Sequence, residues 1–402
     1  MPPQSRIACL DLDTFFVSVE RLLDPSLVGK PVIVGGGPGK RGVVTSASYE
    51  VRPLGVHAGM SMADALRKAP HAVVVPPRHD TYGPYARRVR AVIDRYCPVV
   101  QTASIDEFFL DFRGCEGLYR RAGDPTDEAT IERIVRQLRE AVQSEVGLPA
   151  SVGIGATRPV AKMASARAKP AGVLLVPAGG EVAFAGGFPV RRFPGIGPVA
   201  EQKLVAAGVH TLGDLLAVRP AIEASFSRIA VAVRAALCPT EATVLGRDQL
   251  AFHEHDSLGA TGTLSNERTF GRDIRDPRVL EDQLRALSER VAWRARQRGA
   301  LARTVELKIR RADFHTWLRS RTIQPTHTEA RVFEVVRELF SEAWSGQAIR
   351  LLGVGLSNLV RPPPQLTLPL GKQPVPVHRA IDSVRERFGC DAIRLGVGRV
   401  KR

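Results

Sequence analysis

The sequence predicts a multi-domain protein of the α+β or α/β class, and three observations lead to this prediction. Its 402 residues are enough for two to four domains with sizeable cores. Residues 6–113 mix short apolar runs, such as RIACLDLD and KPVIVGG, with helical stretches such as YARRVRAVIDRYC. From about residue 245 the composition changes and basic residues accumulate, which indicates a separate domain.

The charge balance limits the classes of partner. The formal net charge is +16 and the isoelectric point is about 10.3, which favours nucleic acid first and an anionic membrane surface second. No apolar run approaches the ~18 residues of a membrane span, and the N-terminus reaches an acid too early for a secretory signal. The five cysteines lack CxxC spacing, so neither a disulfide framework nor a zinc site is indicated. We therefore expect a cytoplasmic protein.

Acidic residues inside apolar runs are the first candidates for chemistry. Asp11 and Asp13 are two apart in the strand-like RIACLDLD, so their side chains share a face. Asp106 and Glu107 are adjacent in SIDEFFLDF and converge only if the chain turns there. Ionised carboxylates in such places cost several kcal/mol unless a cation compensates them. A cluster of these acids would suit two divalent ions ~3.5–4 Å apart, although each dipeptide alone is common at surfaces and caps.

A basic sheet face is the second candidate. Residues 285–321 carry eleven Lys and Arg against three Asp and Glu, which is half of the net charge. The run TVELKIR alternates with period two, so Val305, Leu307 and Ile309 are expected on one face and Glu306, Lys308 and Arg310 on the other. A second strand, TWLRSRTI, is expected to add Arg319 and Arg321 to the basic face, as a surface for DNA phosphates. A solvated strand face is the alternative.

Four motifs, in their order and spacing, resemble the Y-family translesion DNA polymerases, and within them the bacterial DNA polymerase IV group. These motifs are ACLDLDTFFVSVE, TSASYEVRPLGV, SIDEFFLD and AKMASARAKPAGV. The resemblance covers about residues 6–360 and implies a right-hand polymerase fold. It implies a palm of mixed sheet plus helices at 1–14 and 73–168, small fingers at 15–72, a helical thumb at 169–240, an α/β little finger at 245–360, and a clamp-binding linker with a basic tail at 361–402.

The resemblance also implies the active-site residues. Asp11, Asp106 and Glu107 match the metal ligands, and the carbonyl of Leu12 would complete the shell of one of two Mg²⁺ ions. Asp13 matches an acid that is not a direct ligand. The nucleotide-binding positions match Phe16, as the steric gate against a 2′-hydroxyl, and the triphosphate contacts Ser46, Tyr49, Arg52 and Lys169.

Two further segments are expected to hold DNA and the sliding clamp. Gly195, Ile196 and Gly197 lead into a helix start at Pro198, as in a helix–hairpin–helix that binds phosphate through backbone N–H groups. The Pro-flanked QLTLPL resembles a clamp-binding peptide, with Gln365, Leu366, Leu368 and Leu370 as its contacts; a plain spacer is the alternative. From Arg361 on, nine Lys and Arg face three Asp and Glu, and a short helix, VHRAIDSVRERFG, could bind DNA, pack back or stay mobile.

The resemblance implies a monomeric DNA-directed DNA polymerase that extends primer–template DNA with dNTPs opposite damaged or misaligned template, with low fidelity and tethered to the clamp. We weighed two alternatives. One is a non-catalytic, clamp-tethered DNA-binding subunit, which would have no reason to keep three costly acids together. The other is a nucleotide cyclase with a similar core, which would need neither the basic C-terminal half nor the clamp-like peptide.

Overall fold

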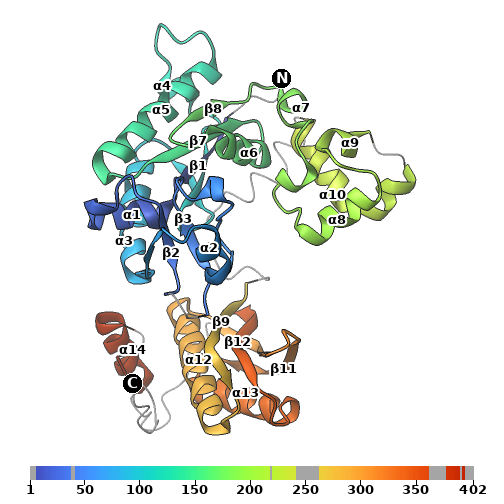
Figure 1. The fold of residues 1–402 in the computed structure, drawn as a ribbon. Coiled ribbons are helices and arrows are strands. Elements are labelled where there is room, and N and C mark those ends of the chain that lie inside the picture. The colour runs from blue at the N-terminus through green and yellow to red at the C-terminus, as the bar shows by residue number, and fades with distance from the viewer. Residues whose placement is uncertain are drawn as a thin grey trace, which may run out of the picture. The chain divides into compact units, whose positions relative to one another are not determined.

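The computed structural model describes residues 6–37, 41–217, 220–240, 262–361, 377–389 and 392–393. The chain divides into two compact units, Met1–Glu254 and His255–Arg402 (Figure 1). Both units combine helices with β-sheet, as the α+β prediction requires.

A five-stranded sheet organises the first unit. Its order is β5-β6-β1-β7-β8, in which β1 runs antiparallel to both of its neighbours, and β7 runs parallel to the edge strand β8. The strands are β1 (Ile7–Leu12), β5 (Val99–Thr102), β6 (Glu107–Asp111), β7 (Ala150–Gly155) and β8 (Val173–Leu175).

Helices cover both faces of this sheet. Ala8, Leu10 and Leu12 of β1 belong to the core formed with α3 (His79–Ile93) and α5 (Asp127–Val146). The alternate residues Ile7 and Cys9 instead pack with Ala161 of α6 (Arg158–Ala168) on the opposite face. Because side chains alternate along a strand, Asp11 belongs to the α6 face. The short α4 (Glu116–Tyr119) precedes α5.

A glycine sets the close approach of α6 to the sheet. A Cβ added to Gly153 of β7 would lie 2.1 Å from both the carbonyl oxygen of Ala161 and the amide nitrogen of Ser165. No side chain fits there, so the helix backbone can lie directly against the strand. This contact fixes the height of the α6 side chains above β1.

A smaller sheet and a helical segment complete the first unit. The three-stranded sheet has the order β3-β2-β4 and packs against α1 and α2. Its elements are α1 (Phe15–Leu23), η1 (Pro25–Leu27), β2 (Val32–Gly35), β3 (Val44–Ala47), η2 (Arg52–Leu54), α2 (Met62–Lys68) and β4 (Val73–Val75). The helical segment shares a core with α6 and consists of α7 (Glu181–Ala185), η3 (Val190–Arg192), α8 (Pro198–Ala206), α9 (Leu212–Leu216) and α10 (Pro220–Leu237).

The second unit is a four-stranded antiparallel sheet, β11-β10-β12-β9, with two long helices packed on one face. The predicted alternation in TVELKIR is confirmed, because Val305, Leu307 and Ile309 are at most 1% exposed. The elements are β9 (Leu264–Ile274), α12 (Pro277–Gln297), β10 (Leu301–Arg311), β11 (Thr316–Thr326), α13 (Glu329–Ala343), β12 (Ile349–Val360) and α14 (Val377–Phe388).

The predicted position of Arg319 and Arg321 is wrong. In the β10–β11 register they stand opposite Leu307 and Val305, and residues directly opposite in a sheet share a face. Both arginines therefore lie on the helix-covered side rather than beside Lys308. Arg321 pairs there with Glu338 and, at 2.6 Å, with Glu342 of α13.

The C-terminal helix α14 packs back onto the second unit. Arg385 is 1% exposed and donates to Glu289 of α12 at 2.6 Å. Asp382 accepts two hydrogen bonds from Arg296 of α12, at 2.7 and 2.8 Å, and Arg296 also donates to Glu329 of α13 at 2.7 Å. Of the three possibilities considered for this helix, namely binding DNA, packing back or staying mobile, the structure shows packing back.

Within the described ranges, no helix is long and apolar enough to cross a membrane. Among the described residues, Cys9, Cys97, Cys115 and Cys238 are free thiols.

Candidate active site

The predicted acids meet at one end of the β1–β6 pair. Asp11 and Glu107 are direct cross-strand partners, and the amide of Leu12 donates to the carbonyl of Asp106 at 2.9 Å. Strand β6 begins at Glu107, and Asp106 lies in the turn before it, where the amide of Ser104 donates to the main-chain carbonyl of Glu107. The predicted turn at 106–107 is therefore confirmed, with Asp106 inside it and Glu107 as the first residue of β6.

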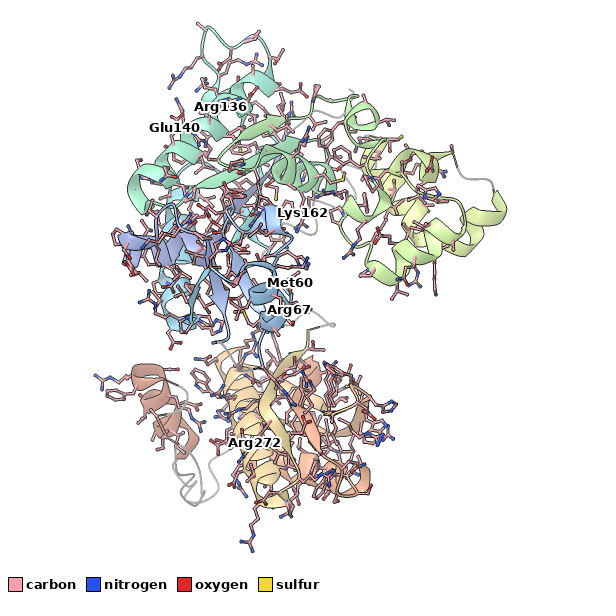
Figure 2. All side chains as sticks on the ribbon, viewed as in Figure 1. Met60, Arg67, Arg136, Glu140, Lys162 and Arg272 are labelled. Atoms are coloured by element: carbon pink, nitrogen blue, oxygen red, sulfur yellow. The ribbon has the colours of Figure 1, made fainter. Side chains whose placement is uncertain are left out.

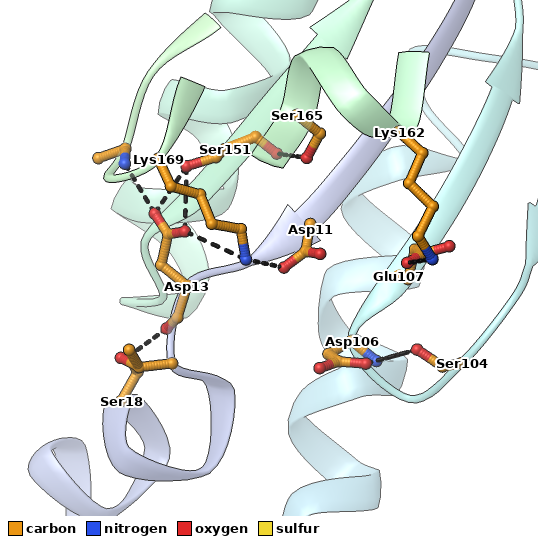
Figure 3. A network of polar contacts seen from close by, with 12 residues as sticks. Asp11, Asp13, Ser18, Ser104, Asp106, Glu107, Ser151, Lys162, Ser165 and Lys169 are labelled. Carbon is orange, nitrogen blue, oxygen red and sulfur yellow. Dashed lines mark hydrogen bonds and ion pairs between the residues drawn. The ribbon is translucent and has the colours of Figure 1, made fainter. Parts of the chain in front are cut away.

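Two lysines face these acids from α6 and its C-terminal end. Lys162 projects from α6 (Figure 2) and lies 2.5 Å from Glu107, while Lys169 forms an ion pair with Asp11 (Figure 3). Burial opposes the charged form of Lys162, but the hydrogen bond and charge of Glu107 outweigh it and raise the pKa of Lys162. Lys162 was not predicted from the sequence. It stands seven residues, about two helical turns, before Lys169, and this spacing could have indicated that both lysines face the same acids.

Asp13 is the buried centre of the polar network in Figure 3. It is 1% exposed and accepts hydrogen bonds from Ser151 Oγ at 2.9 and 3.0 Å and from the amide of Ala171 at 2.7 Å. Tyr49 Oη also donates to it, at 3.0 Å, and Lys169 lies 3.8 Å away. Asp13 therefore holds the strand β7, the chain after Lys169 and the Tyr49 ring together.

Tyr49 and Arg52 come together as predicted. The guanidinium of Arg52 lies over the Tyr49 ring, 4.5 Å from its centroid, and its Nε donates to the carbonyl of Ala47. Burial, and then the Asp13 carboxylate, raise the pKa of Tyr49, so that its hydroxyl stays a hydrogen-bond donor at neutral pH.

A cavity of about 400 Å³ lies between these groups. Of the predicted site residues, Asp11, Leu12, Asp106, Ser46, Arg52 and Lys169 line it. Phe15 also lines it, whereas Phe16, Tyr49 and Glu107 do not. The Phe16 ring stacks on Tyr82 with a centroid distance of 4.1 Å.

The donor set fits a hard divalent cation. Burial raises the pKa of Asp11; Lys169 lowers it, and the charges of Asp106 and Glu107 raise it further. The three carboxylates therefore repel one another, and a cation between them would relieve this repulsion. In the part of the chain that the structure describes, no three His, Cys, Asp or Glu side chains are arranged to hold a metal as they stand, and Asp11 and Glu107 each pair with a lysine instead.

Apart from Arg319 and Arg321, the predicted DNA-binding residues lie in two places. Gly195 has φ +97°, Ile196 is 4% exposed, and Gly197 is the N-cap of α8, so the predicted helix start at Pro198 is confirmed. Lys308 and Arg310 lie on the open face of the second sheet, where Lys308 pairs with Glu267 at 2.8 Å and Arg310 donates to Thr316. The predicted clamp contacts, Gln365, Leu366, Leu368 and Leu370, lie outside the described residues.

Comparison with known proteins identifies the family. Residues 10–166 match the impB/mucB/samB family, and residues 262–368 match its C-terminal domain. The chain is 34% identical to DNA polymerase IV of Dehalococcoides mccartyi strain CBDB1 over 97% of both chains. It is 35% identical to DNA polymerase IV of Caulobacter vibrioides, over 97% of this chain and 93% of that one.

Solved structures show the same fold. A Y-family DNA polymerase chimera superposes with a TM-score of 0.71 at 22% identity, over 89% of this chain and 99% of that chain. DinB from Sulfolobus solfataricus gives a TM-score of 0.55 at 22% identity, over the same shares. Together with the acidic cluster beside Arg52 and Lys169, these matches separate the chain from both alternatives, the non-catalytic subunit and the nucleotide cyclase. The chain belongs to the Y-family of DNA polymerases, is similar throughout its length to the DNA polymerase IV group, and is a DNA-directed DNA polymerase that acts in translesion synthesis.

Proposed function

We propose that this polymerase inserts deoxynucleotides opposite damaged or misaligned template, with low fidelity, by two-metal nucleotidyl transfer at the end of the β1–β6 pair. One observation carries the proposal. Asp11 and Glu107 are cross-strand partners with Asp106 beside them, and the adjoining cavity is also lined by Arg52 and Lys169. Acids and cations lining the same cavity are what a nucleoside triphosphate with its metal ions requires.

Asp11, Asp106 and Glu107, with the main-chain carbonyl of Leu12, would hold two Mg²⁺ ions. Carboxylate and carbonyl oxygens are the ligands that Mg²⁺ prefers, and the mutual repulsion of the three acids favours cation binding. When bound, such ions supply charge stabilisation to the attacking and leaving oxygens of an in-line displacement. Lys162 and Lys169 would then have to give up part of their contact with Glu107 and Asp11.

The other side chains bind and orient the triphosphate. Arg52 and Lys169 present fixed positive charge to the β- and γ-phosphates and to the departing pyrophosphate, and Ser46 offers a hydroxyl from β3. The Arg52 guanidinium stacks on the Tyr49 ring, and the Tyr49 hydroxyl donates to Asp13, which holds the ring in place. The primer 3′-hydroxyl loses its proton to solvent, its oxygen forms a bond to the α-phosphorus, and the bond from that phosphorus to pyrophosphate breaks, so that positioning and charge perform the catalysis.

Phe16 is proposed as the steric gate. A phenyl ring beside the sugar leaves no room for a 2′-hydroxyl, and so selects deoxynucleotides by exclusion. The resemblance assigns the gate to Phe16, whereas Phe15 lines the cavity but is 3% exposed and belongs to the buried core of the five-stranded sheet.

The remaining parts of the chain would grip DNA and the replication machinery. The five-stranded sheet corresponds to the palm, the three-stranded sheet to the fingers, the helical segment to the thumb and the second unit to the little finger. Gly195–Gly197 would bind primer–template phosphates through backbone N–H groups, and Lys308 with Arg310 would bind them from the open sheet face. Residues 365–370 would tether a monomeric enzyme to the sliding clamp.

Primer extension tests the catalytic proposal. Asp106→Ala and Glu107→Ala should each abolish extension with Mg²⁺ and dNTPs while leaving DNA binding largely intact. Asp94→Ala removes an exposed acid that pairs with Arg90, and should extend normally. Ordinary extension by purified Asp106→Ala or Glu107→Ala protein would refute the assignment.

Clamp stimulation tests the tether separately. Deleting residues 365–370 should spare extension of a short primer without clamp and remove the stimulation that the clamp gives. Unchanged stimulation would show that these residues are only a spacer.

A further inference from the structure

A buried side-chain network stands directly behind Phe16. Phe16 lies in the first turn of α1, and its ring stacks on that of Tyr82 from α3, with centroids 4.1 Å apart and planes inclined by 14°. Tyr82 is 0% exposed, so its ring is held on every side. The His79 and Phe16 rings are nearly perpendicular, with their centroids 6.3 Å apart. The face of Phe16 away from solvent is thus packed against a ring that has little freedom to move.

Glu20 fixes the far end of that ring. Tyr82 Oη donates to Glu20 Oε1 at 2.7 Å and accepts from the backbone amide of Arg78 at 3.0 Å. The Arg78 guanidinium donates to both carboxylate oxygens of Glu20, through Nε at 3.1 Å and through Nη2. Glu20 is 0% exposed, and a buried carboxylate of this kind is stable only when its oxygens are bonded in this way.

The spacing on α1 links the anchor to the gate. Phe16 and Glu20 are four residues apart, so they lie on one side of the helix, one turn apart. Tyr82 spans this turn, with its ring on Phe16 and its hydroxyl on Glu20. Burial raises the pKa of Tyr82 to about 12, which keeps its hydroxyl protonated as the donor at neutral pH.

We propose that Glu20, held by Arg78, is a positioning residue for sugar selection: it fixes Tyr82, and Tyr82 fixes the Phe16 ring where it excludes a 2′-hydroxyl. The inference rests on the proposed role of Phe16. Exclusion needs a rigid wall, because a ring that can withdraw from the sugar relieves the clash with the extra oxygen. The Glu20–Tyr82 hydrogen bond supplies this rigidity from outside the nucleotide cavity.

The measurement is the ratio of insertion efficiencies, kcat/KM, for a dNTP over the matching rNTP opposite one template base. Glu20→Gln keeps the shape of the side chain but loses the charge that holds Arg78, and Tyr82→Phe removes only the hydroxyl. Each should lower the dNTP/rNTP ratio by about two- to tenfold, the range that the loss of one hydrogen bond gives. Tyr82→Leu removes the stacked ring and should lower the ratio further. The loss should come mainly from better rNTP insertion, not from poorer dNTP insertion.

Glu116→Gln is the matched control. Glu116 is also a buried glutamate of the same unit, 8% exposed and paired with Arg6 at 2.5 Å, but it begins α4, away from α1 and α3. Its substitution should lower thermal stability as Glu20→Gln does and leave the dNTP/rNTP ratio unchanged. A general loosening of the fold would move both variants alike.

Phe16→Ala separates the two levels of the argument. If it lowers the ratio strongly while Glu20→Gln and Tyr82→Phe stay within twofold of the parent enzyme, the positioning role is wrong and the gate stands. If Phe16→Ala itself leaves the ratio unchanged, the gate assignment fails and this inference fails with it, although loss of extension in Asp106→Ala would still support the catalytic site. Should Glu20→Gln not fold, Tyr82→Phe alone decides, because it leaves every packed carbon atom in place.

Discussion

Replacing Asp13 by Asn tests whether one buried carboxylate organises the nucleotide site. The substitution keeps the size of the side chain and changes only its hydrogen bonding. In the structure both carboxylate oxygens accept: Ser151 Oγ donates to each of them, Tyr49 Oη to one and the amide of Ala171 to the other. An Asn side chain offers one oxygen and one NH₂ group, so at least one of these donors would face another donor.

The expected loss of stability follows from these contacts. A hydrogen bond to a charged, buried acceptor contributes about 1.5–3 kcal/mol, and the unmatched donor adds a desolvation penalty of similar size. Part of the attraction to Lys169, 3.8 Å away, is lost as well. We expect Asp13→Asn to lower the free energy of unfolding of the first unit by about 2–4 kcal/mol. For a unit of this size that corresponds to a fall in Tm of roughly 5–15 °C.

The same change should weaken nucleotide binding more than chemistry. Tyr49 carries the Arg52 guanidinium on its ring, and Ala171 follows the chain segment that places Lys169. We therefore expect the KM for dNTP to rise by about tenfold, with a smaller fall in kcat, because the triphosphate contacts lose their support. Calorimetry and single-nucleotide insertion kinetics measure the two effects.

Asp111→Asn is the control for Asp13→Asn. Asp111 is 7% exposed and accepts from Arg113 Nε at 2.9 Å, at the opposite end of β6 from Glu107. It should lower Tm and leave the KM for dNTP unchanged. An Asp13→Asn enzyme with the parent Tm and KM would show that the hydrogen bonds to Asp13 do not organise the site.

Three other changes have defined outcomes. Gly153→Ala would place a Cβ 2.1 Å from two backbone atoms of α6, so the first unit should lose several kcal/mol or fail to fold, as circular dichroism would record. Burial raises the pKa of Glu181, so the folded protein binds a proton at this carboxyl more tightly than the unfolded chain does, and the free energy of unfolding falls as the pH rises past the ordinary glutamate range. Glu181→Gln should therefore raise the free energy of unfolding by about 1 kcal/mol at pH 7 and leave it unchanged below pH ~4. Urea titrations at the two pH values measure this difference. Arg385→Met breaks a buried pair with Glu289 and should cost the second unit about 3–5 kcal/mol in calorimetry, whereas Met at the exposed Arg387 should cost almost nothing.

The position of the acidic cluster could be predicted from the sequence because it depends on local patterns. Strand alternation places Asp11 on a definite face of β1, and an acid pair inside an apolar run makes sense only at a turn. The pairing of β1 with β6, which brings Asp11 opposite Glu107, is not local. The sequence analysis did not predict this pairing, since no short-range rule states which strands of a multi-domain chain are neighbours; the resemblance implied only that the three acids act together.

The error on Arg319 and Arg321 has a different cause. The sequence analysis correctly placed both arginines on one face of the strand TWLRSRTI, but it assigned that face to the basic side of the sheet from charge alone. In the same strand Trp317 and Ile323 have the parity of the two arginines and pack against the helix-side core, so the apolar residues gave the correct face. Arg321 can lie there because β11 is an edge strand, where a long side chain reaches past the core to the acids of α13.

The partners of the C-terminal helix could not be predicted, because they are 86 and 96 residues away in sequence. Their presence changes how the basic composition must be read. Arg385, Arg296 and Arg321 each contribute to the net charge, yet each is bound to carboxylates of its own unit. The charge of such an arginine is largely neutralised by its carboxylate partner, so it attracts DNA only weakly. Because its guanidinium is already bound, it does not contact a DNA phosphate directly and releases no counterion from the DNA. A count of Lys and Arg therefore indicates the class of partner, whereas the surface that meets DNA has to be found among the cations that the fold does not already use.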